Sequence, residues 1–87
     1  MIDAVIVSTA RTPIGRAYKG AYNNTHGATL AGHAIKRAVA AAGIDPSSVE
    51  DCLLGCGMPE GATGNNIARQ AAIRAGLPVT TAGATIN

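Results

Sequence analysis

The sequence predicts an α/β fold in which strands and helices alternate in the order β-α-β-α-β. Two stretches, about residues 29–42 and 66–75, carry alanines at the i, i+3, i+4 spacing of a buried helix face. Three short apolar runs flank them, at residues 4–7, 51–58 and 82–87. A glycine and then a proline follow each helical stretch and end it. Strands that alternate with helices in this way form a parallel sheet, with the helices packed against it.

The first predicted strand is Ala4 to Val7, a short and mostly β-branched run that is typical of a strand covered on both faces. A long connection follows from Arg11 to Ala28, and its glycines, asparagines and proline indicate a loop. Loops of this length are usually functional or are covered by another part of the protein. The sequence does not place a helical turn within it.

The first helix is predicted to begin at Thr29 as its N-cap and to run to about Ala42. Gly43 is predicted as the left-handed residue after the helix, and Pro46 prevents its continuation. The apolar stripe consists of Ala31, Ala34, Ile35, Ala38 and Ala42. Three polar residues fall mostly off this stripe and are expected to face solvent, namely His33, Lys36 and Arg37.

Asp51 to Met58 is predicted as the second strand, and Pro59 to Gly64 as a loop. Asn66 is expected to cap the second helix, which Gly76 and Pro78 end. The buried stripe of this helix is predicted to be Ala68, Ala71, Ala72 and Ala75. The third strand is predicted at about Ala82 to Asn87.

The composition indicates a segment that depends on partners for its stability. The chain has 87 residues, of which 11 are glycine, and its only aromatic residues are Tyr18 and Tyr22. Small side chains remove little apolar area from water, which is worth roughly 25 cal/mol per Å². Sparse charge and a net charge of +2 argue against disorder. We therefore expect close packing within a larger protein rather than an autonomous core.

Charge and hydropathy argue against several classes of partner. The basic residues form no run and are not interleaved with aromatic residues, so nucleic-acid binding is not supported. No apolar stretch approaches the roughly 20 residues that span a bilayer. The first predicted strand follows Met1 almost at once, which leaves no room for a signal peptide. A cytoplasmic protein is therefore the expectation.

The reactive side chains form no recognisable catalytic or metal-binding pattern. Cys52 and Cys56 would lie about 13 Å apart in one strand, beyond disulfide reach, and neither has a ligand-spaced histidine. They are interpreted as two small buried or half-buried thiols, and neither is taken as the nucleophile. No paired spacing typical of acid–base catalysis is found among His26, His33, Asp3, Asp45, Glu50, Asp51 and Glu60.

Two features before and within the second helix allow more than one interpretation. The segment Gly61 to Asn66 precedes a helix but lacks the spacing of a nucleotide-binding loop, which favours a structural loop. Arg69 and Gln70 are either solvated helix residues or donors of hydrogen bonds across a buried interface. The sequence leaves these two readings of Arg69 and Gln70 equally open.

Four stretches, in the same order and spacing, resemble the thiolase family over essentially the whole chain. They are Val5 to Arg16, Leu30 to Pro46, Gly64 to Ala72 with Ala75 to Pro78, and Thr85-Ile86-Asn87. The chain departs from many thiolases at Gly64-Asn65-Asn66-Ile67, where they have Gly-Gln-Asn-Pro. Met58-Pro59-Glu60-Gly61 is more similar to the degradative 3-ketoacyl-CoA thiolases, while the biosynthetic acetoacetyl-CoA type stays open.

The resemblance implies that residues 1–87 are part of the N-terminal thiolase domain, within a fold layered α-β-α-β-α when intact. It implies an acyltransferase of fatty acid metabolism that catalyses CoA-dependent thiolysis of 3-ketoacyl-CoA, or the reverse Claisen condensation, through a cysteine acyl-enzyme. In thiolases the nucleophilic cysteine follows a Thr-Ile-Asn strand end after two further residues. The resemblance therefore implies that this chain contains no catalytic, cofactor-binding or metal-binding residue and is inactive alone, and that coenzyme A thioesters are substrates of the intact enzyme.

The resemblance also implies partners, which are the remainder of the polypeptide and a second copy in a homodimer or tetramer. The third strand would be an edge strand that pairs across the dimer two-fold, and an unpaired edge suits such pairing. Its residues are Ala82, Gly83, Ala84, Thr85 and Ile86. Two other functions compete, a segment of a ketoacyl-synthase-type condensing enzyme and a non-catalytic interaction module. The Arg-Thr-Pro turn at Arg11 and the Ala-Arg-Gln helix at Ala68 argue against the first.

Overall fold

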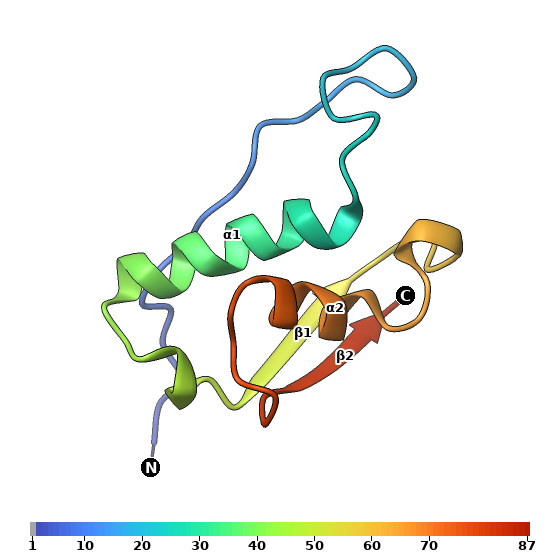
Figure 1. Cartoon of the computed structure of the whole chain (residues 1–87). Helices are drawn as coiled ribbons and strands as arrows, with labels where there is room; N and C mark the ends of the chain where they lie inside the picture. Colours follow the sequence, from blue (N-terminus) through green and yellow to red (C-terminus); the bar gives the residue numbers. More distant parts are fainter. Residues whose placement is uncertain (1) are drawn as a thin grey trace.

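The structure is a computed structural model, and it describes residues 2–87. Its helices and strands follow the order α1 (Gly27–Ala42), β1 (Asp51–Gly55), α2 (Ile67–Arg74) and β2 (Ala82–Ile86). Both helices lie on one side of the two-stranded sheet (Figure 1). α2 packs against both strands, and α1 packs against α2. The predicted α/β class, with strands in parallel and helices packed against them, is confirmed.

The two strands are parallel, with Asp51 opposite Ala82 and Gly55 opposite Ile86. Along each strand, exposed residues alternate with half-buried ones, because only one face of the sheet is covered. The third predicted strand is confirmed as β2. The second is shorter than predicted, because Cys56 to Met58 extend beyond β1 where β2 offers no further paired residue.

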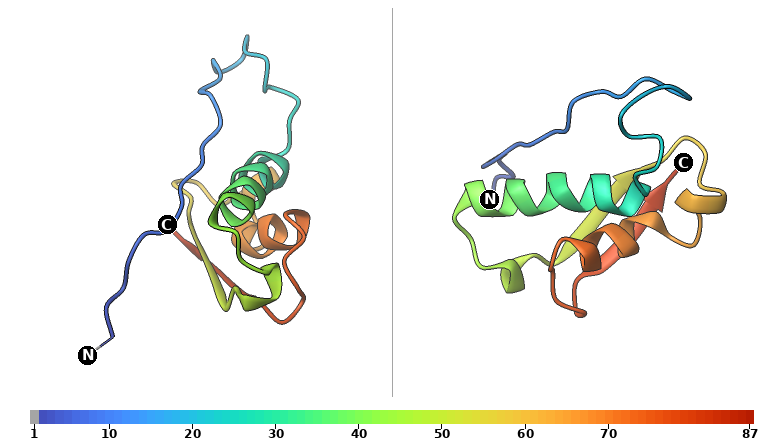
Figure 2. Two further views of the ribbon diagram at one scale, coloured as in Figure 1. Left: turned by 90° about the vertical axis from the view of Figure 1, so that its left-hand side faces the viewer. Right: turned by 45° about the horizontal axis from the view of Figure 1, so that its top comes forward.

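The prediction of a strand at Ala4 to Val7 is wrong for this structure. These residues form no ladder, and Val5, Ile6 and Val7 are 74%, 87% and 71% exposed. Figure 2 shows the segment leaving the packed body of the fold. A β-branched run favours extended backbone, but a strand also needs a neighbour that pairs with its backbone groups. Among residues 2–87 only β1 and β2 form a sheet.

Helix α1 begins three residues before the predicted position, and its N-cap is His26 rather than Thr29. The His26 Nδ1 accepts a hydrogen bond from the Ala28 N–H at 3.1 Å, so the imidazole takes the part of a capping oxygen. The predicted end is confirmed, since Gly43 is left-handed with φ of 70°. His33, Lys36 and Arg37 are exposed as expected.

Helix α2 matches its prediction at both ends. Asn66 caps it, with Oδ1 accepting from the Arg69 N–H at 3.4 Å. At the other end the Leu77 N–H donates to the Ala72 carbonyl at 3.1 Å, while Gly76 is left-handed with φ of 89°. This is a Schellman ending, in which glycine accepts the left-handed backbone without strain from a Cβ. The predicted stripe of four alanines is buried throughout.

The packed core lies between the helices and the covered face of the sheet. Ala72, Ala75 and Leu77 form its buried centre. It is completed by residues of α1, of β1 and of the turn before β1, namely Ile35, Val39, Cys52 and Val49. Within the described residues, no helix is both long and apolar enough to cross a membrane. The core therefore holds α2 against the sheet, and the residues of α2 contact the end of β2.

Candidate functional site

The carboxyl ends of β1 and β2 meet at one edge of the sheet. Gly55 pairs with Ile86 there, and the Cys56 N–H donates to the Ile86 carbonyl at 2.8 Å. In open parallel sheets, ligands and reacting groups lie beyond this edge. The region beyond the carboxyl ends of β1 and β2 is therefore the candidate site. The elements that fix its position are α2 and the loop before it.

Asn66 joins the start of α2 to β2. Its backbone is left-handed, with φ of 57°, a conformation that asparagine tolerates better than most residues. Its side-chain Nδ2 donates to the Gly83 carbonyl at 2.9 Å, and its Oδ1 caps the helix. One side chain therefore binds the first turn of α2 and the middle of β2 together.

Thr85 makes the second connection between these elements. Its Oγ1 accepts from the Ala68 N–H at 3.1 Å and donates to the Asn66 Oδ1 at 2.8 Å. Since a backbone N–H can only donate, the hydroxyl proton is left to point at Asn66. This agrees with the orientation of the Asn66 amide, whose oxygen faces Thr85 and whose nitrogen faces the Gly83 carbonyl.

Arg69 holds the segment that leads into β2. Its guanidinium donates to the Thr81 carbonyl and, at 2.7 Å, to the Val79 carbonyl. Thr81 is buried, and its Oγ1 donates to the Val49 carbonyl at 2.9 Å, which also ties this segment to the start of β1. Arginine suits this position because its planar fork presents several donors in fixed directions.

Gln70 binds the loop before α2, with Nε2 donating to the Gly64 carbonyl at 2.7 Å and to the Asn65 carbonyl at 3.0 Å. Arg69 and Gln70 are both half-buried. Of the two readings that the sequence left open, Arg69 agrees with hydrogen bonding across an interface, because its acceptors lie in the segment before β2. Gln70 agrees with neither reading in full, because its acceptors lie in the loop directly before its own helix. Their acceptors are backbone carbonyls, which no residue pattern identifies in advance.

The loop from Gly61 to Asn66 is structural, as the sequence favoured. The Thr63 Oγ1 donates to the Met58 carbonyl at 2.7 Å and to the Glu60 carbonyl at 3.1 Å, which closes the loop on itself. The N–H groups of Ala68 and Arg69, in the first turn of α2, already have acceptors within the chain. They are therefore not free to hold a phosphate.

Neither cysteine is placed as a nucleophile. Cys52 faces α2, and its Sγ lies 3.9 Å from the Ala68 carbonyl, to which it donates. Burial, assisted by the charge of Asp51, raises the pKa of Cys52, so the thiol stays protonated. Cys56 is half-buried just beyond β1, and both cysteines are free thiols. The interpretation of two half-buried thiols is confirmed.

Two of the histidines and carboxylates serve as caps of helical turns. His26 caps α1, a role that sequence reasoning missed because histidine is not among the preferred N-cap residues. His33 is exposed on α1, and Asp45 caps the short 3-10 turn Pro46–Ser48. Within residues 2–87, no three side chains of histidine, cysteine, aspartate or glutamate gather as metal ligands would.

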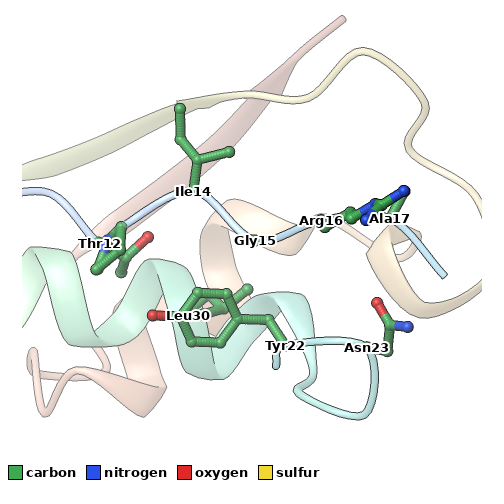
Figure 3. A pocket seen from close by; sticks show the side chains of 9 residues that line it. Thr12, Ile14, Gly15, Arg16, Ala17, Tyr22, Asn23 and Leu30 are labelled. Carbon is green, nitrogen blue, oxygen red and sulfur yellow. The ribbon is translucent and has the colours of Figure 1, made fainter. Parts of the chain in front are cut away.

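The connection before α1 forms a shallow pocket of about 360 Å³ (Figure 3). Residues 12–17 line one side, and Tyr22, Asn23 and Leu30 line the other. Gly15 crosses the Tyr22 ring so closely that an added Cβ would lie 2.5 Å from its Cδ2. The lining contains no carboxylate, thiol or imidazole. The pocket therefore lacks an acid–base pair. A glycine occupies position 15 because a larger residue would clash with the Tyr22 ring.

Comparison with known proteins identifies related chains. Residues 4–87 match the family described as thiolase, N-terminal domain. The chain is 42% identical to a 3-ketoacyl-CoA thiolase of Saccharophagus degradans over 86 residues, which cover 98% of the chain and 22% of that protein. It is 39% identical to the 3-ketoacyl-CoA thiolase of Bacillus subtilis over 87 residues, 100% of the chain and 22% of that protein. The protein of the same name from Photobacterium profundum is 39% identical over 88 residues, 100% of the chain and 23% of that protein. The chain thus spans less than a quarter of the length of these relatives.

Proposed function

The chain belongs to the thiolase family, and we propose that it forms the first part of an acyltransferase acting on coenzyme A thioesters. The intact enzyme would cleave a 3-ketoacyl-CoA with CoA, or run the reverse Claisen condensation of acetyl-CoA. The observation that carries this proposal is the position of β2. Its carboxyl end lies where parallel sheets place their chemistry. The capping residue Asn66 bonds the Gly83 carbonyl of β2, and Arg69 of α2 bonds the segment that leads into the strand.

In the proposed mechanism, the nucleophile is a cysteine that follows β2 in the intact polypeptide. A cysteine thiol at a helix N-terminus becomes more acidic and can form an acyl-enzyme. In thiolysis the thiolate would attack the 3-keto carbon, the C2–C3 bond would break and acetyl-CoA would leave after protonation of its C2, and the acyl group would then pass to the thiol of CoA. In the condensation direction the thiolate would attack the thioester of acetyl-CoA, and CoA would leave as the thiol. The present chain would supply the support for this group rather than the group itself. We therefore assign no catalytic, cofactor-binding or metal-binding residue to residues 1–87. The names of the relatives favour the degradative 3-ketoacyl-CoA type.

We also propose that two exposed surfaces are covered in the intact assembly. One face of the sheet presents Leu53, 66% exposed, and Ile86, 56% exposed, which suits burial by the remainder of the polypeptide. In the described sheet, β2 pairs only with β1, so its other edge is open to the edge of a second copy. A cytoplasmic homodimer or tetramer of fatty acid metabolism is the resulting proposal.

A thiolysis assay tests this function. Acetoacetyl-CoA and CoA are incubated with the 87-residue chain or with the intact polypeptide that contains it, and acetyl-CoA is quantified by chromatography. We expect turnover by the intact polypeptide and none by residues 1–87 alone. Turnover by the 87-residue chain would contradict the assignment of the nucleophile to a later residue. Absence of turnover by the intact polypeptide, with acetoacetyl-CoA and longer 3-ketoacyl-CoA alike, would contradict the proposed reaction.

A further inference from the structure

The end of β2 needs an anchor beyond its own ladder. Within the described sheet this strand has one neighbour and five paired residues. A backbone hydrogen bond contributes only about 1 kcal/mol net to stability, so the ladder with β1 alone holds the end of so short a strand weakly. A reacting group just beyond Ile86 would be displaced whenever this end of the strand separates from β1. Accurate placement therefore requires contacts from outside the ladder.

The side chains of Asn66 and Thr85, together with the Ala68 N–H and the Gly83 carbonyl, supply these contacts, and we call them the Asn66–Thr85 clamp. The Ala68 N–H donates to the Thr85 Oγ1 at 3.1 Å, which donates to the Asn66 Oδ1 at 2.8 Å. The Asn66 Nδ2 then donates to the Gly83 carbonyl at 2.9 Å. Each donor in the series has an acceptor, and the series begins on α2 and ends on β2.

The base of the clamp is buried and closely packed. Ile67 and Ala68, at the start of α2, are 3% and 0% exposed. At Gly83 the backbone of β2 comes so close to α2 that an added Cβ would lie 2.9 Å from the Arg69 Cα. The clamp therefore connects a buried turn of α2 to Gly83 and to Thr85, the residue one position before the end of β2.

We propose that Asn66 and Thr85 are positioning residues for catalysis. They fix the carboxyl end of β2, and through it the orientation of the nucleophile that follows, without touching substrate themselves. This inference rests on the proposed function. A small displacement of a reacting group reduces the rate of the chemical step far more than it reduces substrate binding, when the binding groups lie elsewhere.

The test compares kinetic constants of the intact polypeptide carrying Thr85→Val, Thr85→Ser or Thr80→Val. Valine keeps the shape of threonine and removes the hydroxyl, whereas serine keeps the hydroxyl. Thr80 is an exposed residue of the turn before β2 and serves as the matched control. We expect Thr85→Val to lower kcat about 10- to 100-fold with KM within about twofold. Thr85→Ser and Thr80→Val should stay within about threefold of the parent kcat.

A second variant and a second readout separate positioning from folding. Asn66→Asp keeps a capping oxygen but replaces the donor to Gly83 with a charged acceptor that repels the Gly83 carbonyl, so it should lower kcat in the same way as Thr85→Val. The rate at which iodoacetamide alkylates the proposed nucleophile should change in both variants, since alkylation depends on the placement of the thiol and not on turnover.

Three outcomes would overturn the positioning role. They are an unchanged kcat in Thr85→Val, a fall in kcat that Thr85→Ser does not restore, and a loss of activity that only parallels a loss of folded protein by circular dichroism. The failure of the proposed function is distinguishable, because the unsubstituted intact polypeptide would then show no thiolysis at all.

Discussion

Gly83 is the residue at which β2 approaches the backbone of α2. An added Cβ would lie 2.9 Å from the Arg69 Cα and 3.0 Å from its N, and backbone atoms cannot turn aside as a flexible side chain can. Gly83→Ala should therefore destabilise the intact protein by about 1–3 kcal/mol through overpacking. Gly55→Ala is the matched control, since its nearest neighbour would be the Ile86 O at 4.0 Å. Urea unfolding measures the free energy of unfolding of Gly83→Ala and Gly55→Ala. Equal values for the two variants would contradict the prediction.

The ionisation of a single residue, Cys52, makes the free energy of unfolding depend on pH. Burial and then the charge of Asp51 raise its pKa, so the folded protein holds the thiol proton more tightly than the unfolded chain does. Its contribution to stability is complete below the unfolded pKa of about 9.0 and is lost as pH rises through the folded pKa. Above that pH, Cys52→Ala should lose less stability with rising pH than the parent. Parallel pH profiles of melting temperature from pH 8 to about 10.5 would contradict this.

The two helices show what a sequence can and cannot predict about an element. α2 was predicted at both ends because Asn66 and Gly76 belong to the residue types that cap helices, and local chemistry decides such ends. The start of α1 was missed because an imidazole replaces the usual capping oxygen at His26. The acceptors of Arg69 are carbonyls near β2, and only the tertiary packing of α2 brings them within reach.

The cap of α1 gives a prediction at the scale of the element. Removing the acceptor in His26→Ala leaves the Ala28 N–H without its partner, which should cost about 0.5–2 kcal/mol of stability. His26→Asp should retain or raise the stability, because aspartate is a preferred cap and its charge complements the positive end of the helix dipole. Urea unfolding of the two variants and the parent measures the difference. Equal destabilisation by alanine and aspartate would show that the ring, not its Nδ1, matters.

At the scale of the whole molecule, the chain is more extended than its length requires. Its radius of gyration is 13.6 Å, and its extents are 47, 24 and 23 Å. A compact chain of this length has a radius of gyration of about 12 Å. The excess comes from the residues before α1, which run outside the packed body (Figure 2). The same β-branched run that predicted a strand at residues 4–7 therefore remains without a neighbour, which local sequence cannot supply.

This exposed apolar surface sets the behaviour expected of the isolated chain. Ile2, Val5 and Ile6 are 98%, 74% and 87% exposed, while the buried core consists mostly of alanine, which removes little area from water. The gain from burial is then too small to offset the conformational entropy of ordering the chain. We expect circular dichroism of residues 1–87 to show a broad and non-cooperative thermal change. We also expect 8-anilinonaphthalene-1-sulfonate to fluoresce on binding the exposed faces. The intact polypeptide should instead unfold in a sharp transition, because under our proposal its remaining segments would cover those faces. A cooperative transition of the isolated chain would contradict the dependence on partners, and would favour a self-sufficient interaction module.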